Sequence, residues 1–372
     1  MNAKLLAALA LWTAGPWMPA PHAAGPDGAG PANVLAALPW WTGGAARRDD
    51  ADAGGRAAMP EWNGATGWIN TPPLTRADLR GKVVLVEFWT YTCINWRREY
   101  AYVRAWAEKY APQGLVVIGV HTPEFGFERD IDNVRRAVDA IGVRHPVAVD
   151  SRMAIWNAYG NAYWPALYFI DATGRIRHQH FGEGDYDASE RMLQRLLTEA
   201  GRTGVRQDLV VPAATGAEAA PDWAQLASPE NYIGYARTEG LAAKPVRDRA
   251  HDYAAPAELQ RNQWSPAGAW TLRADSAQAA QSGSRIVYRF HARDLHLVMG
   301  PSTPGARVRF RVTIDGQPPG DAHGVDVDAQ GAGMLDAPRM YQLIRQSGSV
   351  RDRRFEIEFL DPGAEVYSFT FG

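Results

Sequence analysis

The chain has 372 residues, of which 46% are hydrophobic and 22% charged, a composition typical of a globular protein. This length exceeds what one hydrophobic core usually supports, so we expect two or three folded units. The 39 basic and 41 acidic residues give a formal net charge of -2, which excludes the strongly basic surface that nucleic acids and anionic membranes attract.

Residues 1–24 have the composition of a secretory signal peptide. Lys4 precedes the apolar run 5–12, which is too short to span a bilayer, and prolines interrupt the segment soon afterwards. The alternative is an uncleaved N-terminal membrane anchor. We therefore predict an exported protein, periplasmic or otherwise, whose residues 25–60, rich in Gly, Ala, Pro and Asp, form a flexible leader.

Strand-like and helical patterns alternate between residues 61 and 200, which predicts one α/β domain. Strands are expected at 83–89, 115–120 and 146–149, and helices at 95–110, 128–141, 154–159 and 189–199. An antiparallel hairpin is expected from strands 166–170 and 176–181, joined by the turn 171–174. This order of elements predicts helices packed around a mixed sheet.

Residues 201–225 hold small residues and Pro with few large apolar groups, so we predict a linker. Between 226 and 372, apolar and polar residues alternate at period two in segments separated by Gly, Pro and Asp turns. These segments are 284–290, 295–299, 308–314, 340–344 and 355–360. Because no helical pattern separates them, they predict an all-β sandwich of the jelly-roll type.

Cys93 is the single cysteine of the chain, so no internal disulfide can form. It lies between the strand 83–89 and the helix 95–110, which places its thiol at a helix N-terminus. Unpaired backbone N–H groups and the positive end of the helix dipole stabilise a thiolate at such a position. The alternative is a buried cysteine that packs as a small apolar residue.

Several motifs occur in an order that resembles a known family. Residues 84–93 resemble the strand and active-site approach of thioredoxins, and Trp164-Pro165-Ala166 resembles their cis-proline loop. The remaining motifs are His-Thr-Pro-Glu-Phe at 121–125, Tyr-Gly-Asn at 159–161, Tyr-Trp-Pro-Ala at 163–166 and His-Phe-Gly-Glu-Gly at 180–184. Together they resemble the thioredoxin-like domain of the DipZ family, a branch of the TlpA-type extracytoplasmic thioredoxins. The resemblance covers residues 60 to 200 and continues through the C-terminal half, which is similar to that family's carbohydrate-binding-module-like domain.

The family pattern Cys-x-x-Cys is replaced here by Cys93-Ile94-Asn95-Trp96. In a dithiol site the second thiolate resolves the mixed disulfide that the first one forms. Trp96 lacks a thiol, so an external thiol reductant has to release a mixed disulfide at Cys93.

Three functions remain open at this point. The first is a monothiol redox protein that acts on a thiol- or disulfide-bearing protein partner, and the second is a redox-inactive binding or chaperone-like module on a thioredoxin scaffold. The third is a one-cysteine peroxidase, because Thr90 and Cys93 match part of a peroxiredoxin signature. That signature also requires a proline where this chain has Val86, so the peroxidase is the least favoured of the three.

The resemblance also implies roles for residues around Cys93. Glu87 corresponds to the buried acid beneath a thioredoxin site, which relays protons or tunes the thiol; the alternative is a partly exposed strand carboxylate. Pro165 corresponds to the cis-proline beside the active cysteine. The residues expected to line the partner groove are Thr92, Trp96, Thr122, Glu124, Asn161, Tyr163 and Trp164. For Thr122, Glu124, Asn161 and Tyr163 the alternative is local packing or capping.

We expect no cofactor and no metal. His178 and His180 share one face of a strand but lack a third ligand nearby, so a polar strand face is favoured. Residues 326–331 begin like a calcium loop but lack the glutamate at its twelfth position, which favours a simple turn. Trp264 and Trp270 are candidates for stacking on a sugar, although core packing is favoured and carbohydrate binding rests on fold analogy alone.

Overall fold

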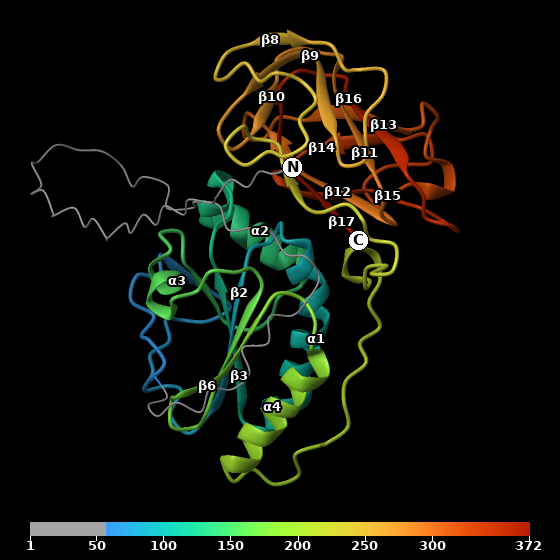
Figure 1. Ribbon diagram of the computed structural model, residues 1–372. Helices are drawn as coiled ribbons and strands as arrows, with labels where there is room; N and C mark the ends of the chain where they lie inside the picture. The colour runs from blue at the N-terminus through green and yellow to red at the C-terminus, as the bar shows by residue number, and fades with distance from the viewer. Residues whose placement is uncertain (1–56) are drawn as a thin grey trace, which may run out of the picture. The chain divides into compact units, whose positions relative to one another are not determined.

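The computed structural model describes residues 57–372, and Figure 1 shows how their helices and strands follow one another. The predicted signal peptide and nearly all of the predicted leader lie outside the described residues. The described residues, 57–372, lie within one compact unit.

The first half of the described chain contains a six-stranded mixed sheet in the order β1-β4-β3-β2-β5-β6. Its strands are β1 (Gly67–Ile69), β2 (Val83–Trp89), β3 (Leu115–His121), β4 (Val147–Val149), β5 (Ala166–Ile170) and β6 (Ile176–Phe181). The pairs β2–β3 and β3–β4 are parallel, whereas the other three pairs are antiparallel. The helices are α1 (Ile94–Tyr110), α2 (Ile131–Ile141), α3 (Ala154–Tyr159) and α4 (Tyr186–Glu199). This is the thioredoxin-like α/β architecture that the sequence predicts.

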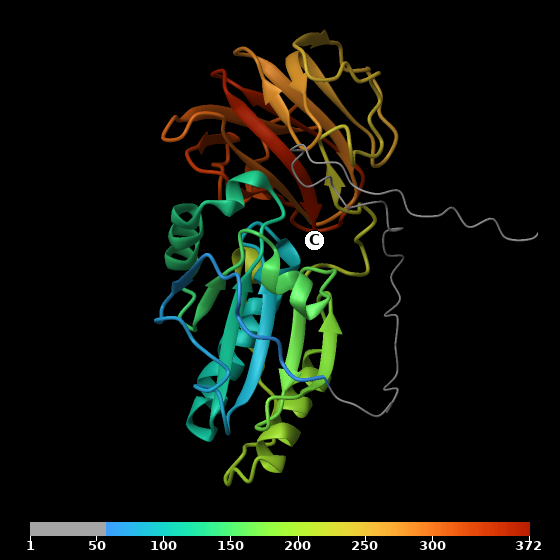
Figure 2. The ribbon, with the colours of Figure 1, turned by 90° about the vertical axis from the view of Figure 1, so that its left-hand side faces the viewer.

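Alternate residues of β2 contribute to two separate hydrophobic cores. Val83, Leu85 and Trp89 pack in the cluster that contains buried residues of α1, α2 and α4. Val84, Val86 and Phe88 pack on the other face, against α3 and the segment 59–79. Figure 1 shows α1 and α4 on one side of the sheet and α3 on the other, and Figure 2 shows the segment after residue 57 crossing the α3 face. Because both faces are covered, every residue of β2 is buried.

Helix starts differ from the prediction by three residues at two places. The predicted helix 128–141 is a 3₁₀ turn, Gly126–Arg129, followed by α2. The break occurs because the Asp130 side chain accepts a hydrogen bond from the backbone N–H of Asp132 (2.8 Å) and so caps a new helix. The last helix, α4, begins at Tyr186, three residues before the predicted start.

The second half of the described chain is an antiparallel β domain. Its longest path runs β14-β13-β16-β11-β9-β10-β17-β12-β15, with β7 paired to β17 and β8 paired to β9. The strands are β7 (Asn231–Tyr232), β8 (His251–Tyr253), β9 (Trp264–Leu272), β10 (Ala277–Ala279), β11 (Ser284–Phe290), β12 (Asp294–Pro301), β13 (Val308–Ile314), β14 (Ala332–Leu335), β15 (Arg339–Arg345), β16 (Arg353–Phe359) and β17 (Ala364–Phe371). Since β9 pairs with β11 through residues 264–267 and with β10 through residues 270–272, it links the two layers into one curled sheet.

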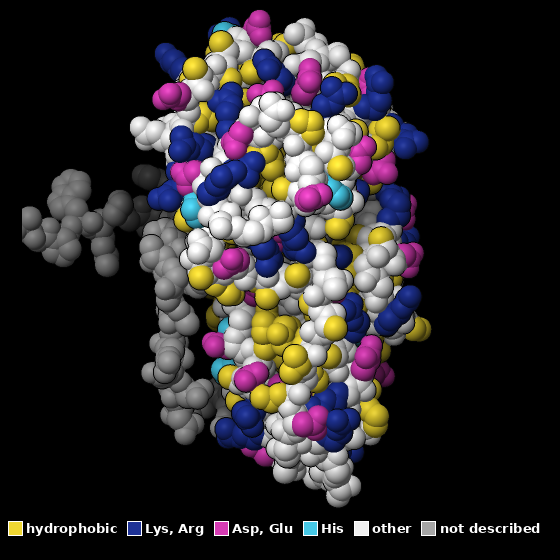
Figure 3. All heavy atoms as spheres, turned by 90° about the vertical axis from the view of Figure 1, so that its right-hand side faces the viewer, with side chains coloured by type: hydrophobic (Ala, Val, Ile, Leu, Met, Phe, Trp, Pro, Cys, Tyr) yellow, Lys and Arg dark blue, Asp and Glu magenta, His cyan; other side chains and the backbone are white. Residues whose placement is uncertain are grey.

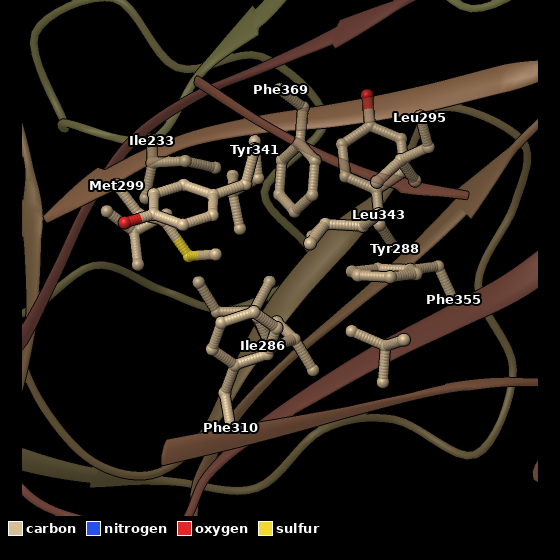
Figure 4. Packing of buried hydrophobic residues seen from close by; sticks show 14 of the residues in the cluster. Ile233, Ile286, Tyr288, Leu295, Met299, Phe310, Tyr341, Leu343, Phe355 and Phe369 are labelled. Carbon is tan, nitrogen blue, oxygen red and sulfur yellow. The ribbon is translucent and has the colours of Figure 1, made fainter. Parts of the chain in front are cut away.

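The sequence prediction missed β9, because Pro266 and Gly268 lie inside it and interrupt the expected alternation. The curled sheet encloses an aromatic and aliphatic core, part of which is drawn in Figure 4. Trp264 and Trp270 are fully buried in this core and cannot stack on a sugar from solvent. Core packing, the favoured interpretation of these two residues, is therefore confirmed.

Surface charge is mixed on the face drawn in Figure 3, where Lys and Arg side chains are interspersed with Asp and Glu. This distribution agrees with the near-zero net charge of the sequence. Across residues 57–372, no helix has the length and apolarity needed to cross a membrane.

Candidate redox site

Cys93 is the N-cap residue of α1, with extended backbone angles (φ -74°, ψ 115°). Its N–H donates to the carbonyl of Thr90 (3.2 Å), which closes the turn after β2. Its own carbonyl accepts from the N–H of Arg97 (3.1 Å), the first hydrogen bond of the helix. The predicted position of the thiol at a helix N-terminus is confirmed.

The surroundings of the Cys93 thiol oppose its ionisation. The side chain is partly exposed, but burial among neighbouring atoms raises the pKa of the thiol well above its usual range. The backbone N–H of Trp96 lowers this pKa, as expected at a helix N-terminus, whereas the charges of Glu230 and Glu124 raise it further. Helix position alone therefore predicts the wrong direction for the thiol pKa.

Trp96 lies entirely beneath the surface, with 0% of its side chain exposed. Its ring stacks on that of Trp89 at a centroid distance of 4.1 Å, and its Nε1–H donates to Glu87 Oε2 (3.1 Å). The prediction that Trp96 lines the partner groove is wrong, because a fully buried indole offers no surface to a partner. Trp96 instead fills the space beneath the site.

Glu87 is also fully buried, so the alternative of a partly exposed strand carboxylate is wrong. Its second carboxylate oxygen, Oε1, lies 2.8 Å from His145 Nε2. Gly119 permits this packing, because a Cβ there would lie 2.7 Å from Trp89 Nε1 and 3.0 Å from His145 Nε2. The contacts place the carboxylate against Trp96 and His145.

The Trp164–Pro165 peptide bond is cis, in agreement with the expectation for this loop. Trp164 is fixed by its Nε1–H, which donates to the carbonyl of Thr122 (3.1 Å), and the N–H of Thr122 donates to the carbonyl of Trp89 (2.9 Å). Ala166 pairs with Phe88 across the sheet. The cis-proline loop, Thr122 and the end of β2 are therefore brought together.

Tyr163 is the most exposed of the predicted groove residues, with 49% of its surface accessible. Its ring lies 5.2 Å from that of Phe181, which is 43% exposed. Asn161 is buried and donates to the carbonyl of Tyr163 (2.9 Å), so it supports the loop rather than a partner.

Thr92 and Thr122 were predicted to line the groove, but both side chains are buried. The hydroxyl of Thr122 donates to Asp150 Oδ2 (3.3 Å), and that of Thr92 donates to Glu128 Oε1 (2.6 Å). That part of the prediction is wrong, because internal carboxylates already satisfy both hydroxyls.

Glu128 is the site residue that sequence reasoning missed, since it was assigned to a helix. Its Oε2 accepts the backbone N–H groups of Glu124 (2.7 Å) and Phe125 (2.9 Å). Burial raises the pKa of this carboxyl to about 7. The sequence feature that could have identified Glu128 as a site residue is its position four residues after Glu124, beside the motif 121–125.

Among residues 57–372, no group of three or more His, Cys, Asp or Glu side chains is placed to hold a metal ion. Asp328 Oδ1 accepts the backbone N–H groups of Gln330 and Ala332 (both 2.9 Å), as in the simple turn predicted for 326–331.

A thioredoxin fold with a cysteine at the start of α1, a buried acid below it and a cis-proline loop alongside defines a thioredoxin-like redoxin. The family model for AhpC/TSA proteins matches residues 57–179, and the model for the thioredoxin-like C-terminal domain matches residues 228–372. The chain belongs to the DipZ-like redoxins, which join these two domains.

Three similar proteins illustrate the relationship. Protein DipZ of Mycobacterium tuberculosis is 39% identical over 321 residues, covering 84% of this chain, which in turn spans 42% of the length of that relative. The thiol-disulfide oxidoreductase YkuV of Bacillus subtilis is 32% identical over 145 residues, which are 39% of this chain and 97% of YkuV. A solution structure of an oxidised thioredoxin-like protein is 32% identical, with a TM-score of 0.36, over 39% of this chain and 97% of its own.

Proposed function

We propose that the protein acts in thiol–disulfide exchange as a monothiol redoxin through Cys93. The observation that carries this proposal is the position of Cys93 at the N-terminus of α1, with the cis Trp164–Pro165 loop tied to the end of β2. The relationship to thiol-disulfide oxidoreductases such as YkuV supports the same chemistry.

In the proposed reaction the Cys93 thiolate attacks one sulfur of a partner disulfide. The partner's S–S bond breaks, its second sulfur leaves as a thiolate that takes up a proton, and Cys93 is left in a mixed disulfide. Trp96 has no thiol to resolve this species. An external thiol attacks the partner's sulfur, forms a new disulfide with it and releases Cys93 as a thiolate.

The test uses the full-length protein and oxidised glutathione. We expect intact-mass spectrometry to show one glutathione adduct per chain, stable until an added thiol such as dithiothreitol removes it. The Cys93→Ser variant is the control and should form no adduct. A wild-type protein that forms no adduct during hours at about pH 8 contradicts the proposal.

A second candidate is a redox-inactive binding module on the same scaffold. The raised pKa of the Cys93 thiol favours this alternative, because a protonated thiol is a poor nucleophile. The exposed rings of Tyr163 and Phe181 beside the cis-proline loop are the surface that it would use. The glutathione experiment separates the two, since only the redox protein forms the adduct.

We also propose export of the mature protein. The support is the sequence pattern of residues 1–24 alone. Protein recovered from the cell envelope should begin between about residues 14 and 25 when its N-terminus is sequenced. Recovery of chains that still begin at Met1 contradicts cleavage and favours a membrane anchor.

A further inference from the structure

Glu124 is held by two residues of the C-terminal domain. Its carboxylate, with 9% of the side chain exposed, accepts a hydrogen bond from the hydroxyl of Tyr232 and lies 3.6 Å from Arg237 Nη2. The guanidinium of Arg237 lies 3.3 Å from the centroid of the Tyr232 ring, so the three side chains form one contact. The loop that follows β3 in the thioredoxin-like domain is thereby joined to the chain around β7.

The loop that contains Glu124 is also connected to the residue before Cys93. Thr92, the residue before Cys93, bonds to Glu128, and Glu128 accepts the backbone N–H of Glu124. Glu124 is therefore fixed at its backbone by the thioredoxin-like domain and at its carboxylate by the C-terminal domain.

Apolar packing keeps this arrangement in place. Phe125 shares a small buried cluster with Tyr232 and Val298 of the C-terminal domain. Arg98 of α1 adds a polar contact, because its Nη2 donates to the carbonyl of Phe371 (3.2 Å). These contacts between the two domains keep the Glu124 carboxylate at a fixed position in the fold.

We propose that the C-terminal domain is part of the redox site: Tyr232 and Arg237 fix Glu124 in the loop that Glu128 ties to Thr92, and the carboxylates of Glu124 and Glu230 act on the Cys93 thiol. Glu230 directly precedes β7 and so comes from the same segment as Tyr232. Glu124 and Glu230 are then positioning residues that set the pH range in which Cys93 reacts. A role of these carboxylates in thiol–disulfide exchange rests on the proposed function. Their effect on the Cys93 thiol does not depend on that function.

The charged and titratable groups around this site come from two parts of the chain. Glu124 and Glu128 lie after β3, and Glu230, Tyr232 and Arg237 lie in the C-terminal domain. Both Glu124 and Glu230 raise the pKa of the Cys93 thiol, because a nearby anion disfavours the thiolate. Desolvation raises the pKa of both carboxyls, that of Glu230 to about 8, whereas Arg237 lowers both and so favours their ionised forms.

The single cysteine makes the test direct, because alkylation of the full chain reports on Cys93 alone. The rate of reaction with iodoacetamide is measured between about pH 6 and pH 11 for wild type, Glu124→Gln and Glu230→Gln. We expect the midpoint of the profile to fall in both variants by at least about half a pKa unit, so that alkylation is at least about threefold faster between about pH 8, where Glu230 ionises, and the wild-type midpoint. Glu258→Gln, an exposed acid in the loop before β9, is the matched control and should leave the profile unchanged.

The shape of the pH–rate profile distinguishes a change in the charge near Cys93 from a change in the solvent accessibility of its thiol. A variant that merely loosens the contact between the domains raises the rate at every pH, including the plateau, whereas loss of a charge shifts the midpoint. The proposal is overturned if both Gln variants keep the wild-type midpoint, whatever their plateau rates. A shifted midpoint in a protein that forms no glutathione adduct refutes the proposed function and leaves this inference standing.

Discussion

Trp96 is the residue at which this chain departs from a dithiol site. Its indole stacks on Trp89 and gives its N–H to Glu87, so the buried carboxylate has a hydrogen-bond donor where a dithiol protein has a thiol. Such a carboxylate is costly to bury without partners. The substitution therefore removes the resolving thiol and satisfies the acid beneath it at the same time.

Replacing Trp96 tests both consequences. Trp96→Cys places a second thiol one helical turn from Cys93, and we expect the variant to gain disulfide reductase activity, measured by insulin reduction with dithiothreitol. It should also lose about 3–5 kcal/mol of unfolding free energy in denaturant titration, because a fully buried indole is removed.

Trp96→Ala provides the matched control for this change. It should show a similar loss of stability without the gain in activity. A folded Trp96→Cys variant with no more reductase activity than Trp96→Ala indicates that the site has lost more than one thiol.

At the scale of elements, the connection between β3 and α2 organises the site. Thr92 reaches it from the turn before α1, and Glu128 closes it by accepting two of its backbone N–H groups. The connection is a 3₁₀ turn rather than the start of a long helix, so Glu128 points inward. A buried carboxyl that accepts from three donors stabilises the loop it belongs to.

The pH dependence of the unfolding free energy should reflect the raised pKa of Glu128. Burial raises its pKa from an ordinary 4.5 to about 7, so the folded chain retains a proton that the unfolded chain releases near pH 4.5. The stabilisation from this proton is complete below pH 4.5 and is lost as the pH rises through 7. Between about pH 5 and pH 8, wild type should lose on the order of 2–3 kcal/mol more unfolding free energy than Glu128→Gln.

Denaturant titrations at several pH values measure this difference. The comparison uses the change with pH within each protein, so a uniform destabilisation of Glu128→Gln does not affect it. Glu258→Gln should follow the wild-type pH dependence. Parallel curves for wild type and Glu128→Gln contradict the assignment of a raised pKa to Glu128.

At the scale of the whole molecule, the two matched domains share buried contacts. Arg98, 3% exposed, pairs with Glu183 of its own domain (3.3 Å) and donates to the carbonyl of Phe371 in the other. Glu183 belongs to the motif 180–184, which contributes to the family resemblance but had no predicted role. The motif thus takes part in joining the domains.

We predict that residues 226–372 nevertheless fold alone, since their aromatic core is built from their own strands. The isolated segment should give a β-sheet circular dichroism spectrum and unfold cooperatively. Separation exposes Tyr232 and Val298, so its unfolding midpoint should lie below that of the full chain. An isolated segment without a cooperative transition shows that the thioredoxin-like domain is required for its folding.

Local patterns determined much of the fold. The buried run 83–89, the hairpin 166–181 and the helix that follows Cys93 are set by hydrophobic periodicity and turn residues, which act over a few positions. The chemical identity of the site followed in the same way, since one thiol and one indole at fixed spacing exclude a dithiol mechanism.

Tertiary structure decided what surrounds those residues. Trp96 is buried and Thr92 is turned inward because Glu87 and Glu128 reach them from other elements. Tyr232 is 108 positions from Glu124 in the sequence, and no local pattern records that contact. The thiol pKa depends on the sum of such neighbours, so the helix N-terminus that the sequence placed at Cys93 was outweighed by burial and by two carboxylates brought there by the fold.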